Sequence, residues 1–251
     1  MFVDPEIVAA AADFWHGNDP TETVLPRDVE SLLWAIQLEC VAIADLDIQK
    51  ALAWLQERKL VLPKRVRGQQ RPIFGCLVAA RDRGYIFVDS NASEQERRFT
   101  VAHETGHFLF DYKKPRQAAV QALGGSIIPV LDGQRKPTET ERIHAILSST
   151  KLNVFVDLLL RGPNNQIISN ETTKAEVRAD QVALELLAPY RDVLRRAKIL
   201  HSSLSAEQIQ ARTKPLLTDE YGLPGSVAVE YSTRLANYYE RRETVREWLG
   251  L

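Results

Sequence analysis

Residues 96–112 read ERRFTVAHETGHFLFDY, and the His-Glu-x-x-His pattern within them is the most informative feature of the sequence. In a helix, positions four apart lie on one face, one turn from each other. The imidazoles of His103 and His107 can therefore reach one metal ion, with Glu104 beside them. Neutral imidazoles suit Zn²⁺, and a neighbouring carboxylate can take a proton from a water that the metal activates.

The residues around this pattern predict the helix that it needs. Ser93 and Glu96 match the Ser-x-x-Glu capping box, so a helix should begin after Asn91 and run to about Tyr112. Apolar or small residues recur at helical spacing on the histidine side, which indicates a buried face. They are Phe99, Ala102, Gly106 and Phe110.

A third metal ligand should come from another segment, and Glu176 is the preferred candidate. Asp180 lies one turn further on and would accept a hydrogen bond from the outer ring nitrogen of a ligand histidine. Ala179, a small residue between them, would permit close approach to the histidine helix. Asp111 and His144 are weaker rivals as third ligand, and a solvated helix surface remains the alternative interpretation.

Hydrophobic periodicity divides the chain into three parts. We expect a helical lead-in over residues 1–60, a domain that carries the motif over residues 61–190, with an insertion of uncertain shape over 113–172, and a helical module over residues 191–251. The helices expected in the lead-in span residues 5–15, 28–43 and 47–60.

Two elements are expected to flank the motif helix. Segment 72–88 holds two apolar runs around Arg81 to Gly84, which predicts a β-hairpin. Segment 173–190 is strongly helix-forming and should be stopped by Pro189. The fold class expected is therefore α+β, with a small sheet beside the motif helix.

The C-terminal segment resembles a helix-turn-helix, with residues 222–224 as the turn and 226–239 as the second helix. A helical pair packed on the catalytic domain is the alternative. Residues 215–240 contain one basic and four acidic side chains, so DNA binding is unlikely. A basic run over 58–71 is either a solvated loop or a docking patch.

Composition sets further limits. The chain has 251 residues, is 45% hydrophobic and 26% charged, and carries a net charge of -1. Such a chain is globular and has no global field that would attract nucleic acid or an anionic membrane. No apolar run reaches the roughly 20 residues of a membrane-spanning helix, and no basic leader precedes the first apolar stretch. We therefore expect a cytoplasmic protein without a membrane partner.

Two blocks resemble the ImmA/IrrE-type metallopeptidases: ERRFTVAHETGHFLFDY and, further on, EVRADQVALELLAP over residues 176–189. The resemblance implies a minimal zincin-like fold. It also implies that His103, His107 and Glu176 bind the metal and that Glu104 is the general acid/base. The gap from His107 to Glu176 is longer than is usual in such proteins.

The resemblance further implies a function. We expect a zinc-dependent endopeptidase, with Mn²⁺ as an alternative metal, that cleaves a helix-turn-helix repressor in a stress-response or mobile-element switch. Two alternatives stay open. One is a DNA-binding regulator in which the peptidase fold is a sensor or relic, and the other is the toxin or stress half of a two-gene pair.

Overall fold

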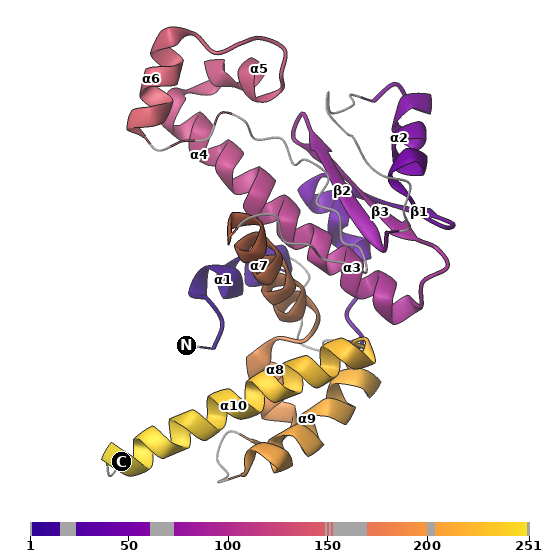
Figure 1. The fold of residues 1–251 in the computed structure, drawn as a ribbon, viewed down its shortest axis with the longest axis vertical. Helices are drawn as coiled ribbons and strands as arrows, with labels where there is room; N and C mark the ends of the chain where they lie inside the picture. The colour runs from indigo at the N-terminus through magenta and orange to yellow at the C-terminus, as the bar shows by residue number, and fades with distance from the viewer. Residues whose placement is uncertain are drawn as a thin grey trace.

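A small sheet and a larger set of helices surround one long helix, α3, in the computed structural model of the chain (Figure 1). The structure describes residues 2–15, 24–60, 73–148, 150, 152, 170–199 and 204–249. In Figure 1 the sheet lies on one side of α3 and helix α7 on the other. The expected α+β, zincin-like fold is confirmed.

The sheet has three strands in the order β1-β3-β2. Strands β2 (Gly75–Ala80) and β3 (Arg83–Asp89) are antiparallel and form the predicted hairpin. Its turn is only Arg81 and Asp82, whose φ angles of 52° and 66° are those of a tight two-residue turn. Gly84, expected in the turn, is already part of β3.

Strand β1 corrects the helix expected over residues 28–43. A 3-10 helix, η1 (Glu30–Ile36), ends at Gln37, which has a left-handed φ of 66°, and β1 (Leu38–Ile43) follows. β1 pairs in parallel with β3 along its whole length. A short apolar run fits a helix or a strand equally well in the sequence, and here pairing with a distant strand decides for the strand.

Both faces of the sheet are covered. Helix α2 (Ile48–Glu57) packs on one face, where its apolar side chains share a core cluster with Cys76, Val78 and Phe87. The alternate positions of β2 and β3 face the other way and share the main core with α3. The sheet therefore supports the helix that carries the motif.

Helix α3 (Glu94–His107) begins with the predicted Ser93–Glu96 capping box. The sequence predicted its end near Tyr112, but the α-helix ends at His107. The chain continues as a π-helical segment, η2 (Phe108–Lys113), and then as α4 (Lys114–Leu123).

The insertion of uncertain shape expected over residues 113–172 is mainly helical where the structure describes it. After α4 come the 3-10 turn η3 (Gly125–Ile127), α5 (Ile128–Leu131) and α6 (Glu139–Leu147). Between residues 149 and 169, the structure describes only residues 150 and 152 of the insertion. The basic run over 58–71 also lies largely outside them, from residue 61 onward.

Helix α7 (Asn170–Leu187) packs against α3, and α1 (Pro5–Trp15) packs on α7. The predicted helix over 173–190 is thus confirmed, with its start three residues earlier. Pro189 ends it as expected and leads into α8 (Tyr190–Arg196).

The C-terminal segment is a helical pair, α9 (Ala206–Asp219) and α10 (Gly225–Leu249). The second helix extends ten residues past its expected end at Tyr239. The pair is tied to the rest of the molecule: Arg98 of α3 donates to the Tyr221 carbonyl oxygen at 2.8 Å, and the Tyr231 hydroxyl donates to the Ala188 carbonyl oxygen at 3.0 Å.

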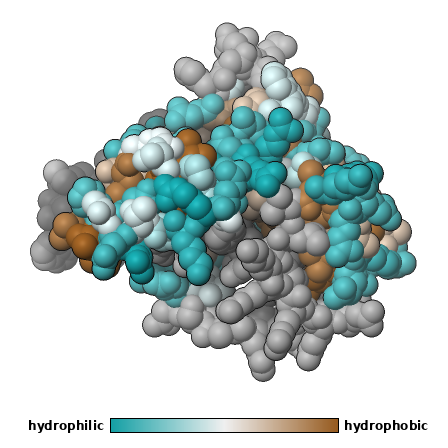
Figure 2. Space-filling view, turned by 90° about the horizontal axis from the view of Figure 1, so that it is seen from above, coloured by the Kyte–Doolittle hydropathy of each residue, from teal (hydrophilic) through white to brown (hydrophobic). Residues whose placement is uncertain are grey.

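Among the described residues, no helix is both long and apolar enough to cross a membrane. Among the coloured residues of Figure 2, hydrophilic side chains predominate and hydrophobic ones form separate patches.

Candidate metal centre

Three side chains from two helices meet at the centre of the molecule. The Nε2 atoms of His103 and His107 lie 3.0 Å apart. From α7, the carboxylate of Glu176 reaches both of them, with Oε2 3.4 Å from His103 Nε2 and Oε1 3.5 Å from His107 Nε2. Each residue offers one ligand atom within 4.8 Å of the other two. The structure therefore brings together the three residues that the sequence analysis selected.

This cluster is buried on its histidine side and open on its carboxylate side. His103, His107 and Glu104 are each 1% exposed, whereas the side chain of Glu176 is 24% exposed. Burial disfavours charge on His107, but hydrogen bonds to Asp111 and Glu176 outweigh it and raise the pKa of His107 to about 9. Burial also opposes charge on Glu176, yet hydrogen bonds to both histidines hold the pKa of Glu176 below its ordinary value. The hydrogen bond between His107 and Glu176 thus favours the charged form of each.

Each histidine has a carboxylate behind it. His103 Nδ1 lies 2.9 Å from Asp180 Oδ1, as the sequence analysis expected of Asp180. His107 Nδ1 lies 2.8 Å from Asp111 Oδ2. Asp111 was considered as a rival third ligand, but it faces the outer nitrogen of His107 and is not in the three-residue cluster.

His144, the other rival ligand, is exposed on α6 and is not part of the cluster. Arg178 was not anticipated at all. Arg178 lies on α7, as Glu176 and Asp180 do, and forms an ion pair with Asp111 of η2. Its position two residues after Glu176 carried no signal in the sequence, because nothing there shows which way α7 lies against η2.

Gly106 explains how α3 and α7 come close enough to share the cluster. A Cβ atom at this position would lie 3.0 Å from the Ala179 Cα and 3.1 Å from the Val182 Cβ. Such distances are too short for ordinary contact, so only glycine permits this crossing. Ala179 is therefore at the point of close approach, as expected from its small size.

Glu104 points toward the first residue of β2. Its Oε1 would lie 3.8 Å from a Cβ added to Gly75, and that Cβ would meet the Thr100 Cγ2 at 2.3 Å. Gly75 thus allows the strand to run close to the helix at Glu104. Glu104 also raises the pKa of His107 by its charge, which shows that the carboxylate acts on the cluster electrostatically.

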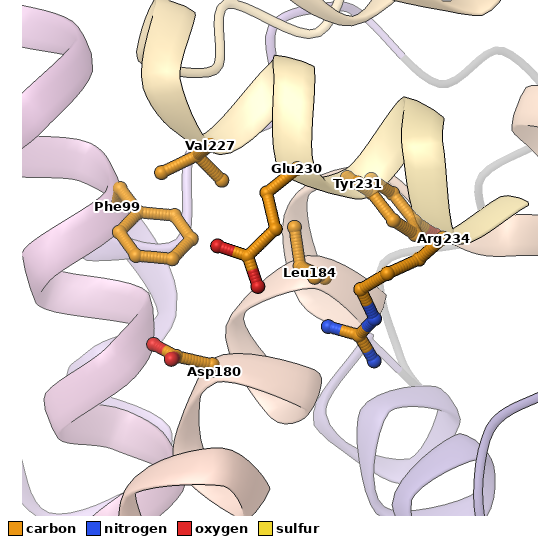
Figure 3. Close-up of a pocket in the computed structure, with 7 residues that line it drawn as sticks. All are labelled: Phe99, Asp180, Leu184, Val227, Glu230, Tyr231 and Arg234. Carbon is orange, nitrogen blue, oxygen red and sulfur yellow. The ribbon is translucent and has the colours of Figure 1, made fainter. Parts of the chain in front are cut away.

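Asp180 has a second neighbourhood besides His103. It borders a cavity of about 50 Å³ between α3, α7 and α10. Figure 3 shows the carboxylate of Glu230 pointing from α10 into this cavity, toward Asp180. The cavity is lined by Phe99, Asp180, Leu184, Val227, Glu230, Tyr231 and Arg234.

Two imidazole nitrogens and one carboxylate form a donor set of catalytic zinc sites, which keep a further position open for water or substrate. The same donors also accept manganese. Both histidines have their outer nitrogens engaged, an arrangement that orients ligand rings in metal sites. The residues present therefore fit a metal ion, and Glu104, next to His103 in the chain, is a buried carboxylate.

Comparison with known proteins agrees with this geometry. Residues 66–126 match the family model of the IrrE N-terminal-like domain, an M78 peptidase family. No curated protein and no solved structure matches the chain. The match contains His103, Glu104 and His107 and ends before Glu176, whose assignment to the cluster rests on the structure. The match confirms the ImmA/IrrE resemblance of the first sequence block, ERRFTVAHETGHFLFDY, whereas the second block lies outside it. Over residues 66–126 the chain is similar to the IrrE N-terminal-like domain of the M78 peptidases, which suggests a metallopeptidase.

Proposed function

We propose that the protein is a zinc-dependent endopeptidase in which His103, His107 and Glu176 hold the metal and Glu104 is the catalytic base. The observation that carries the proposal is the convergence of these three ligand atoms beside a buried carboxylate. A zinc ion held there would supply an activated water at neutral pH. Glu104 takes the proton from the attacking water and delivers it to the leaving amine.

Strand β2 is the best candidate to align an extended substrate. It is an edge strand of the three-stranded sheet in the described part of the chain, and Gly75 at its start lies beside Glu104. An extended peptide can add to such an edge through main-chain hydrogen bonds. The scissile bond would then come within reach of the carboxylate.

For the substrate we propose a helix-turn-helix repressor in a stress-response or mobile-element switch. The family resemblance supports this class of substrate, and it is an argument from analogy. We propose cytoplasmic location on the same basis.

The test is to load the purified chain with zinc or manganese and incubate it with helix-turn-helix repressors, beginning with any that a neighbouring gene encodes. Glu104→Gln should keep about one equivalent of metal and lose cleavage, because Glu104 is a base and not a ligand. Glu94→Gln, an exposed carboxylate on the same helix, is the matched control and should cleave normally. Cleavage by Glu104→Gln at the wild-type rate, or loss of its metal, would contradict the assignment.

A further inference from the structure

The outer partners of the two candidate ligand histidines are held in different ways. The side chain of Asp180, behind His103, is 37% exposed and borders the cavity shared with α10. The side chain of Asp111, behind His107, is 22% exposed and is paired with Arg178. The support of His107 therefore includes Arg178 as well as Asp111.

The carboxylate of Asp111 has both of its oxygens engaged. Oδ2 faces His107 Nδ1 at 2.8 Å, and Oδ1 accepts a hydrogen bond from Nη2 of Arg178. A carboxylate held at both oxygens cannot rotate without breaking one contact. Arg178 therefore restricts the orientation of Asp111, and Asp111 in turn restricts the ring of His107.

The local backbone favours this arrangement. Asp111 lies in the π-helical segment that follows α3, and π-helical turns are rare and often occur at functional sites. The guanidinium of Arg178 also lies over the ring of Phe110, with its Cζ 5.5 Å from the ring centroid. A planar cation on an aromatic face has less freedom to leave its partner.

We propose that Arg178 is a positioning residue of the metal centre, which acts on His107 through Asp111. The inference rests on the proposed function, namely that the cluster holds a metal. Helix α7 would then contribute the ligand Glu176 and a support for each histidine, Asp180 for His103 and Arg178 for His107. Docking of α7 on α3 would complete the ligand set and orient it at once.

A double-mutant cycle on the full chain tests this, with zinc affinity measured by competition with a chelating dye. We expect Asp111→Ala to weaken zinc binding about 10- to 100-fold and Arg178→Ala about 3- to 10-fold. If Arg178 acts through Asp111, adding Arg178→Ala to Asp111→Ala should cause no further loss. A role confined to fold stability would instead lower affinity equally in both backgrounds.

Lys114→Ala is the matched control. Lys114 has the same 36% side-chain exposure as Arg178 and lies over the same Phe110 ring, but its ion pair is with Glu6. It should bind zinc like the wild type. If Arg178→Ala does not fold by circular dichroism, Arg178→Gln, which removes the guanidinium and its charge but keeps a polar side chain, replaces it in the cycle.

Three results would count against the inference. Wild-type affinity in the Arg178 variant, or equal losses with and without Asp111, would overturn the positioning role and leave the proposed function intact. Failure of the wild-type chain to bind zinc would overturn both.

Discussion

Replacing Gly106 by alanine should weaken the metal centre without touching any ligand. The added Cβ would lie 3.0 Å from the Ala179 Cα, whereas ordinary contact begins at 3.4 Å, so α7 must move by at least 0.4 Å (3.4 − 3.0). Functional groups must be held within about 0.5 Å of their productive geometry, so a shift of this size uses most of that margin. Because α7 carries Glu176 and Asp180 against a histidine helix that the sheet holds in place, we expect zinc affinity to fall on the order of 10-fold.

Stability should change less than affinity. Overpacking costs about 1–3 kcal/mol, while alanine gains about 1 kcal/mol over glycine inside a helix. Zinc competition and urea unfolding of Gly106→Ala measure the two effects separately. Gly225→Ala, at a position where an added Cβ meets nothing within 4 Å, is the control. Wild-type zinc affinity in Gly106→Ala would refute the argument that this crossing sets the ligand geometry.

Three further predictions concern α7. Asp180→Ala should weaken zinc binding about 10- to 100-fold, and Glu176→Ala should weaken it more. Glu171 is exposed on the same helix, and Glu171→Ala should bind zinc like the wild type. Normal zinc binding by Glu176→Ala would exclude it as the third ligand. Burial raises the pKa of Glu185 to about 7, from an ordinary value of 4.5. The folded state then keeps a proton that the unfolded chain loses, so stability should fall by up to about 3 kcal/mol as pH rises through this window. Urea unfolding at pH 4.5 and 8 should show this fall, and Glu185→Gln should reduce it to the part that His107, whose pKa is also raised, contributes in the same direction.

Local signals in the sequence predicted the elements that depend on neighbouring residues. The capping box at Ser93 sets the start of α3, and the short polar turn between apolar runs sets the hairpin. Strand β1 was missed because it is stabilised by parallel pairing with β3, some 45 residues further along the chain. No local pattern records that pairing.

In the candidate metal centre, too, the sequence predicted some residues and missed others. His103 and His107 follow from their helical spacing, and Glu176 and Asp180 from the spacing on a second helix together with the family resemblance. The contact between Asp111 and Arg178 depends on how α7 lies across η2, and the sequence gives no register for that packing. The sequence therefore supplied the groups that face the metal position but only one of their two outer supports.

The C-terminal pair provides a last argument about its own role. Tyrosine is a residue type enriched in protein interfaces, yet Tyr221 is 0% and Tyr231 is 1% exposed. The Tyr231 hydroxyl is bonded to the end of α7, and Arg98 of α3 holds the turn before α10 at two carbonyl oxygens. Residues used in this way cannot also serve a partner. The geometry therefore favours a pair that packs on its own peptidase helices, next to the cavity that borders Asp180, and its lack of DNA binding stays a prediction. A salt-sensitive, sub-micromolar affinity of the full chain for duplex DNA would contradict it.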